Sequence, residues 1–452
     1  MELAEEKKAE LNSLFDSRQF KRLKEELCDM NEVDVAELLG EMPPERALVM
    51  FRLLPKDFSS EVFASMEIEE QHHIINSIED TELRSIFEDL AIDDAVDMVE
   101  ELPASVVKRV LKIATPATRN LINEYLQYPE NSAGSIMTAE YVALRPAMTV
   151  EEAFSYIRKN GVDKETIYTC CVITPERKLM GVVTLKDLLM NPYETKVEDI
   201  MDDNVIYALT EEDQEEVASL FNKYDLLALP VVDREMRLVG IVTVDDIVDV
   251  MEQEATEDFE KMAAMAPSEK SYLKTSVLEL ARNRIVWLLV LMLSSTVSGM
   301  ILNHYEATFA AIPLLVGFIP TLMDTGGNSG SQASTMIIRG IAVNEIALSD
   351  LLRVIWKELR VGMLCGALLA AINFVRLIIM YPGHTMICGI VAVSMFLTVI
   401  LAKTLGAALP MGAKALHLDP ALMASPMLTT IVDACSMVIY FTLASHFLTQ
   451  LS

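Results

Sequence analysis

The pattern of apolar and polar residues differs between the first and second halves of the chain. Over residues 1–132, apolar residues recur at helical spacing in short pieces, which are interrupted at Pro43-Pro44, Pro55 and Pro103. Acidic residues near the start of these pieces are typical of helix N-termini. We therefore predict an acidic, all-α N-terminal domain over residues 1–132, in which short helices stack into a superhelix.

An internal repeat occupies residues 133–250. The sequence LMGVVTLKDLL at residues 179–189 returns as LVGIVTVDDIV at residues 238–248. In both copies a β-rich run is followed by Gly-x-x-Thr-x-x-Asp, which predicts a strand, a turn and a helix capped by the threonine. Thr149 and Thr210, ahead of the two copies, are predicted to open acidic helices. The twin units resemble a tandem CBS pair, named after cystathionine β-synthase.

Long apolar runs begin after residue 280. Residues 251–280 predict a connecting helix, broken near Pro267, that leads into them. Residues 281–452 then hold five windows that approach the ~20 apolar residues needed to cross a bilayer. The second window is interrupted by glycines, so we expect part of it to be unwound. The five predicted spans lie near residues 284–303, 309–335, 360–381, 386–409 and 427–449.

Charge supports this division of the chain. Of the 67 acidic and 37 basic residues, 8 and 10 follow residue 270, which leaves a net charge of −32 on residues 1–270. Such an excess argues against nucleic acid as a partner and favours cations. The positive-inside rule places the soluble half in the cytosol and the C-terminus outside, in a multi-pass protein of the cell membrane. The residues behind this assignment are Arg339, Arg353, Lys357, Arg360, Lys403 and Lys414.

Two carboxylates lie within the predicted spans. Asp433 has no basic residue in its own span, and a charged Asp at the bilayer centre costs roughly 2.5–3.5 kcal/mol. Such a residue usually faces a water-filled path or an ion; the alternative is a protonated Asp hydrogen-bonded between helices. Asp324 starts the sequence DTGGNSGSQ, whose Asn328, glycines and carbonyls suit the lining of a cavity. The alternative there is close packing of helices through small residues.

The residue types favour a hard divalent cation. At an effective dielectric constant near 20, a divalent ion ~4 Å from a carboxylate gains roughly 8 kcal/mol before desolvation. Mg2+ gives up its water reluctantly, so one carboxylate with carbonyl groups suits a hydrated Mg2+ ion. No cluster of thiolates or imidazoles is present in the sequence to select Zn2+ or Cu2+.

The sequence DTGGNSGSQ, the later LDPA at residues 418–421 and the Asp433 span, behind a helical domain and a CBS pair, resemble the MgtE family of magnesium channels. The resemblance implies a homodimer with a central pore lined mainly by the second and fifth spans. It matches Asp433 to the pore aspartate that binds hydrated Mg2+, and Asp419 to a carboxylate near the cytosolic entrance. The expected pore-lining residues are Asp324, Asn328, Ser331, Thr335 and Ser425.

Acidic clusters recur in three separate elements of the first 260 residues. Clusters that face one another repel unless divalent ions neutralise them. The resemblance implies gating by cytosolic Mg2+, in which high Mg2+ holds the connecting (plug) helix against the pore; the alternative is that these are ordinary solvated faces. The candidate ligands are Glu61, Asp93, Asp94 and Asp97 in the helical domain, Glu215, Glu216, Asp225, Asp245, Asp246 and Asp249 in the CBS pair, and Glu254, Glu257 and Asp258 in the connecting helix.

The CBS pair departs from the family pattern at the residues expected to bind a nucleotide. CBS pairs often bind adenine nucleotides, and some members of the family resemble ATP-binding proteins through an Arg-Asp step after the first threonine. Here that step is Lys186-Asp187, and Thr169 follows Tyr168 where a second aromatic residue is expected. Lysine keeps the charge but lacks the planar fork of arginine. ATP is therefore the weaker expectation as a ligand, beside Mg2+ as substrate and regulator.

The predicted fold is a multi-domain membrane protein with an all-α N-terminal superhelical domain, an α/β tandem CBS pair, a connecting helix and a five-helix transmembrane domain. Nothing in the sequence resembles a P-loop, a phosphorylated-Asp motif or a catalytic triad, so we expect a transporter and not an enzyme. The expected function is Mg2+ transport through a channel-like pore. Two alternatives are a secondary transporter that exchanges Mg2+ for H+ or Na+, and a membrane sensor that transports nothing.

Overall fold

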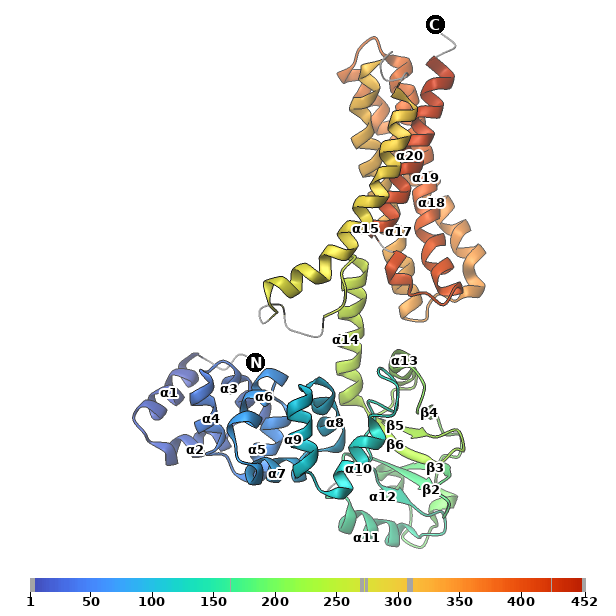
Figure 1. Cartoon of the computed structure of the whole chain (residues 1–452). Coiled ribbons are helices and arrows are strands. Elements are labelled where there is room, and N and C mark those ends of the chain that lie inside the picture. Colours follow the sequence, from blue (N-terminus) through green and yellow to red (C-terminus); the bar gives the residue numbers. More distant parts are fainter. Residues whose placement is uncertain are drawn as a thin grey trace. The chain divides into compact units, whose positions relative to one another are not determined.

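The computed structural model describes residues 5–162, 164–268, 272, 275–306, 312–423 and 425–448. The chain forms two compact units, Met1–Val250 and Met251–Ser452. Figure 1 labels their helices and strands. Each unit is considered by itself below.

The first unit begins with short helices of 8 to 12 residues, as the sequence predicts. Prolines set several of the boundaries: Pro44 and Pro116 occupy the first helical position, where the missing N–H has no intrahelical partner to lose. The helices are α1 (Glu5–Asp16), α2 (Phe20–Cys28), α3 (Glu32–Gly40), α4 (Pro44–Phe51), α5 (Lys56–Ala64), α6 (Ile68–Ser77), α7 (Asp80–Asp89), α8 (Ile92–Glu101), α9 (Ala104–Ile113) and α10 (Pro116–Tyr125).

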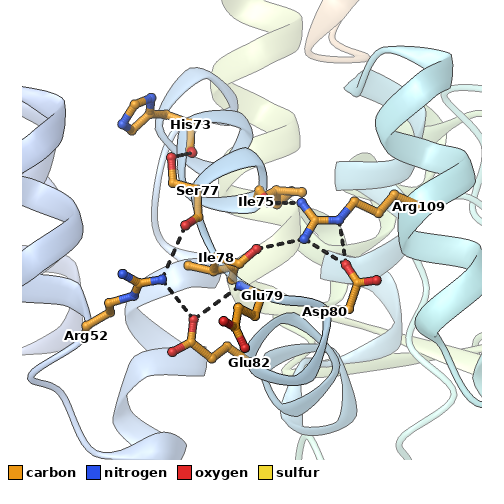
Figure 2. A network of polar contacts seen from close by, with 9 residues as sticks. All are labelled: Arg52, His73, Ile75, Ser77, Ile78, Glu79, Asp80, Glu82 and Arg109. Atoms are coloured by element: carbon orange, nitrogen blue, oxygen red, sulfur yellow. Dashed lines mark hydrogen bonds and ion pairs between the residues drawn. The ribbon is translucent and has the colours of Figure 1, made fainter.

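Two arginines satisfy the backbone at the C-terminal end of α6 (Figure 2). Arg109 of α9 donates to the carbonyl oxygen of Ile78 at 2.7 Å and to Asp80 Oδ1 at 2.8 Å. Arg52, which follows α4, donates to the carbonyl oxygen of Ser77 at 3.3 Å. Carbonyls at a helix end lack intrahelical donors, so these contacts tie α6 to α4, α7 and α9.

Two three-stranded sheets of the same order follow, which confirms the predicted tandem repeat. In each sheet the first strand pairs in parallel with the second, and the second pairs antiparallel with the third. Cys170 packs into the core of the first repeat, while its neighbour Cys171 packs beside residues of the second sheet. The strands are β1 (Ala143–Leu144), β2 (Thr169–Ile173), β3 (Leu179–Thr184), β4 (Ala208–Leu209), β5 (Ala228–Val232) and β6 (Leu238–Thr243).

Threonine caps open two of the helices around the sheets. Thr149 caps α11 (Val150–Asn160) and Thr184 caps α12 (Leu185–Met190), each in a reciprocal capping box. The expectation that Thr210 opens a helix is wrong, because its amide donates to the carbonyl of Val232 at 3.1 Å and so continues the strand pairing. Asp213 caps α13 (Gln214–Tyr224) instead. A 3₁₀ turn, η1 (Val197–Asp199), precedes β4, and α14 (Val244–Met262) follows β6.

The second unit is a bundle of long helices. Within its described residues, four segments are long and apolar enough to cross a membrane: Val277–His304, Leu348–Met380, Thr385–Ala415 and Pro420–Phe447. α19 packs against α17, α18 and α20, and α15 packs against α20. The helices are α15 (Val277–His304), α17 (Ile319–Ala342), α18 (Leu351–Met380), α19 (Thr385–Ala415) and α20 (Ser425–Leu448), with 3₁₀ turns η2 (Pro313–Phe318), η3 (Leu348–Asp350) and η4 (Pro420–Met423).

α17 corresponds to the second predicted span. It has 24 residues, enough to cross a bilayer, but its Gly, Ser, Thr and Asn residues make it less apolar than the four other segments. The glycine-rich sequence that we expected to be unwound is a regular part of this helix, so that expectation is wrong. The reason lies in how closely its neighbours approach it.

Candidate ion pathway and acidic clusters

One face of α17 consists of glycines that lie against α19 and α20. A Cβ atom at Gly326 would lie 2.7 Å from Thr398 Cγ2 and 2.9 Å from Val432 Cγ1, and one at Gly330 would lie 3.3 Å from the carbonyl oxygen of Ala402. The approach at Gly326 is closer than a Cβ atom allows and that at Gly330 is tighter than most, so the glycines allow α19 and α20 to pack directly on the α17 backbone. The small residues are therefore a packing seam, and this packing keeps the helix regular.

The opposite face of α17 carries a polar stripe. Asp324, Asn328, Gln332 and Thr335 are exposed, and their spacing of three and four residues places them on one side of the helix, with half-buried Ser331 among them. Asn328 Nδ2 donates to Asp324 Oδ1 at 3.1 Å. Polar side chains among membrane spans are costly in contact with hydrocarbon. The stripe holds four of the five expected pore-lining residues.

Asp433 of α20 lies at the level of this stripe. The residue before it, Val432, faces Gly326 of α17, and Thr429, one turn away, lies 3.0 Å from where a Cβ atom of Gly327 would stand. The Asp433 side chain is half-buried and has no hydrogen-bond or ion-pair partner within the part of the chain that the structure describes. The interhelix hydrogen bond considered as the alternative role therefore finds no partner there.

Near the start of α20, Ser334 Oγ of α17 donates to the carbonyl oxygen of Met423 at 3.3 Å and so ties η4 to the seam. Ser425, the fifth expected pore-lining residue, begins α20, but its side chain lies outside the described residues.

Asp419 precedes η4 and uses both carboxylate oxygens. Its Oδ1 accepts from the backbone N–H of Ala421 at 2.8 Å, and its Oδ2 accepts from Lys261 Nζ of α14 at 2.7 Å. Lys261 also contacts Glu257 Oε1 at 2.6 Å. Desolvation and then the charge of Asp419 raise the pKa of half-buried Asp258. Three of the predicted carboxylates, Glu257, Asp258 and Asp419, thus gather around one lysine.

A second acidic cluster forms in the first unit. Although Asp94 of α8 keeps solvent contact, desolvation and the charges of Asp246 and Glu140 raise its pKa to about 6. Desolvation also raises the pKa of Asp246, against the effect of a hydrogen bond from Thr243 Oγ1 at 2.5 Å. Glu165 has a raised pKa because of desolvation and the nearby charges of this cluster. The charge of Asp245 acts on both Glu165 and Asp246, and that of Asp249 acts on Asp246. Four predicted ligands, Asp94, Asp245, Asp246 and Asp249, therefore come together here.

Glu140 and Glu165 were not predicted. Each stands alone in the sequence, between the repeat motifs, and only the backbone hydrogen bond from the N–H of Glu165 to the carbonyl of Glu140, at 2.9 Å, brings their segments together. No acidic run or helical spacing marks them, so local sequence carries no signal for their proximity.

Half-buried Glu254 of α14 lies near the Lys261 group, since its charge contributes to the raised pKa of Asp258. The predicted ligands outside the two clusters are dispersed, and the Asp93 side chain falls outside the described residues. Asp225 ends α13 in the left-handed conformation (φ 51°), a backbone role that aspartate fills readily. Among the described residues, no three His, Cys, Asp or Glu side chains form a group that could hold a metal ion directly. The other exposed ligands are Glu61, Asp97, Glu215 and Glu216, and Asp245 and Asp249 of the second cluster are exposed as well.

Family models match most of the chain. Residues 319–443 match the MgtE model, described as a divalent cation transporter. Residues 30–131 match the MgtE intracellular N domain, and residues 133–193 and 197–253 each match the CBS domain.

Relatives align with nearly the full chain. It is 38% identical to the magnesium transporter MgtE of Thermus thermophilus, over 93% of this chain and 94% of the relative. It is 32% identical to the magnesium transporter MgtE of Bacillus subtilis, over 94% and 93%.

Two solved structures resemble the soluble part. The cytosolic domain of the Mg2+ channel MgtE in complex with ATP has 39% identity and a TM-score of 0.52, and covers 54% of this chain and 99% of that one. The soluble part of a magnesium transporter has 29% identity and a TM-score of 0.53, with coverage of 56% and 99%.

Proposed function

Because the chain belongs to the MgtE family of magnesium transporters, we propose that it moves Mg2+ across the cell membrane through a channel-like pore that cytosolic Mg2+ closes. It is a multi-pass membrane protein with an intracellular N-terminal domain. The observation that carries the proposal is Asp433, which is half-buried, has no partner among the described residues and lies at the level of the polar stripe of α17.

The stripe supports a pore shared by two copies of the chain. Asp324, Asn328 and Thr335 are exposed on a helix whose other face is packed, so in a membrane they need a polar neighbour. A second copy that turns the same stripe toward the first would enclose a polar path between two Asp433 carboxylates. Such a path suits a Mg2+ ion that keeps its water, since no three ligating side chains of one described chain converge on a metal. In this arrangement α17 also crosses the membrane, which makes five spans, and the C-terminus lies outside.

The acidic clusters support closure by cytosolic Mg2+. The charge of Asp246 raises the pKa of both Asp94 and Glu165, so the ionised forms of these carboxylates repel. Divalent ions bound among them would neutralise this repulsion and favour one arrangement of the cytosolic part. The Glu257, Asp258 and Asp419 group at α14 gives the regulatory ion a second place to act. Low Mg2+ would then release the closed state.

Asp433→Ala tests the pore. We expect Mg2+ uptake into proteoliposomes to fall at least about tenfold, which corresponds to only 1.4 kcal/mol out of the roughly 8 kcal/mol that a divalent ion gains beside a carboxylate. Asp350→Asn is the matched control, because Asp350 pairs with Arg353 at 3.0 Å outside the stripe and its loss should leave uptake unchanged. Unchanged uptake by Asp433→Ala would remove the pore assignment.

The same vesicles separate the alternatives. A Mg2+/H+ exchanger would use Asp433 as a protonation site, and its flux would follow an imposed pH gradient, whereas flux through a channel-like pore follows the Mg2+ gradient and the membrane potential. A Mg2+/Na+ exchanger would respond to a Na+ gradient in the same way. A membrane sensor would show no uptake above that of empty vesicles.

Nucleotide binding is a second candidate function of the CBS pair, and it is favoured by the similarity to a relative solved with ATP. Lys186 in α12 offers a phosphate a point charge in place of the planar guanidinium fork, so we expect ATP to bind weakly. Calorimetry of the full-length protein with ATP measures this directly, and Lys186→Arg should strengthen binding.

A further inference from the structure

Each oxygen of the Asp419 carboxylate already has a partner within the protein. Its Oδ1 accepts the backbone N–H of Ala421 at 2.8 Å and so shapes the start of η4. Its Oδ2 is occupied by the ammonium group of Lys261 at 2.7 Å. The first contact is structural, so any cation that approaches Asp419 meets Lys261 at the second oxygen.

Lys261 is held in this position from two sides. One turn earlier on α14, Glu257 contacts the same ammonium group at 2.6 Å, and the next residue, Met262, packs against Ile338 of α17 and Ala421 of η4. The Lys261 side chain is 22% exposed, so the pair is neither sealed from water nor free in it. A cation from solution can therefore compete for the Asp419 oxygen.

We propose that Lys261 is a tethered counter-cation that occupies the second oxygen of Asp419, so that Mg2+ binds at this entrance only by displacing it. This inference rests on the proposed function, in which Mg2+ acts at the Glu257, Asp258 and Asp419 group. A lysine fixed to the protein competes at a constant local concentration, whereas Mg2+ competes in proportion to its cytosolic concentration. Lys261 thereby sets the concentration at which the entrance responds.

The direction in which Lys261→Met changes the Mg2+ concentration for half-closure distinguishes competition from a purely structural role of Lys261. Without the ammonium charge, Glu257, Asp258 and Asp419 are left mutually repelling and open to Mg2+. Under competition, Lys261→Met therefore lowers the Mg2+ concentration needed for half-closure. If Lys261 served only to hold α14 against η4, its loss would loosen the closed state and raise that concentration.

The first test uses the unaltered full-length protein in nanodiscs. An amine-acetylating reagent, followed by mass spectrometry, reports how free each lysine is. If Mg2+ displaces Lys261, the labelling of Lys261 rises between a Mg2+-free sample with chelator and one saturated with Mg2+. The labelling of exposed Lys357 of α18 should change little. Constant or falling labelling of Lys261 would overturn the proposal, whatever the transport activity.

The second test measures Mg2+ binding to variants by calorimetry in the same nanodiscs. Lys261→Met should tighten the most affected site about fivefold or more, a typical coupling between two ligands. Lys261→Arg keeps the charge and should restore the original affinity, Lys357→Met should have no effect, and Asp419→Asn should remove most of the gain. Unchanged or weaker Mg2+ binding by Lys261→Met contradicts competition.

The two proposals fail in different ways. If current through the unaltered protein ignores cytosolic Mg2+, the gating proposal fails, while the labelling and binding results still decide the role of Lys261. If cytosolic Mg2+ closes the pore but Lys261→Met changes neither Mg2+ affinity nor the Mg2+ concentration for half-closure, only the proposed role of Lys261 is rejected.

Discussion

The ionised carboxylate of Asp94 is destabilised by burial and by the negative charges of its neighbours. Desolvation and the charges of Asp246 and Glu140 raise its pKa to about 6, so its ionised form opposes folding near neutral pH. We expect Asp94→Asn to stabilise the cytosolic part in chelator by about 1 kcal/mol, a value reduced for solvent screening of a side chain that keeps solvent contact. Urea unfolding of residues 1–250, whose counterparts were solved alone in relatives, measures this.

The matched control for Asp94 is Asp203→Asn, at an exposed bend of the same unit. Mg2+ should stabilise the unaltered segment and the control by mass action on the folded state, but it should stabilise Asp94→Asn less. Equal stabilisation of all three by Mg2+ would show that the ion does not act through Asp94.

Residues that stand out against their surroundings could be predicted, and those defined by distant partners could not. Asp433 and Asp324 are carboxylates in apolar sequence, and Asp94 lies in an acidic run, so composition alone marks them. Lys261 looks from sequence like an ordinary i, i+4 partner of Glu257, which it also is. Its ion pair with Asp419 joins residues far apart in the chain, so no local sequence pattern predicts it.

At the scale of the element, the glycines of α17 are an example of tertiary contact overriding propensity. Glycine disfavours helix by about 1 kcal/mol per residue, which led to the prediction of an unwound segment. The neighbouring helices lie so close that only glycine fits, and this packing keeps α17 helical. Thr210 shows the same limit: its sequence is typical of a cap, but its amide bonds to the carbonyl of Val232 directly after β4, and Asp213 caps the helix instead.

Gly326→Ala tests the packing seam. The new methyl group would lie 2.7 Å from Thr398 Cγ2 and 2.9 Å from Val432 Cγ1, so these side chains or their helices must shift, at a cost of roughly 1–3 kcal/mol. We expect a clear drop in the melting temperature of the full-length protein in detergent. Gly299→Ala in α15 is the control, because no atom lies within 4 Å of its added Cβ, and a similar drop there would contradict the seam.

At the scale of the whole molecule, composition predicts the division into an acidic soluble part and a nearly neutral apolar part. The repeat predicts the CBS pair, because its strands and threonine caps follow from local residue types. The number of spans is harder to predict. The sequence predicts five apolar windows, and each corresponds to a long helix, but only four segments of the described chain are long and apolar enough to cross a membrane by composition. α17 is less apolar because glycines and a polar stripe replace apolar residues in it.

The proposed pore should close when Mg2+ on the cytosolic side rises. The most direct measurement records Mg2+ current through the full-length protein in a planar bilayer of known orientation, while cytosolic Mg2+ is raised from chelator upward at constant driving force. We expect the current to be large in chelator and to fall cooperatively as acidic clusters such as Asp94 and Asp246 are neutralised. A current that stays constant as cytosolic Mg2+ rises, or that grows with it, would contradict the account.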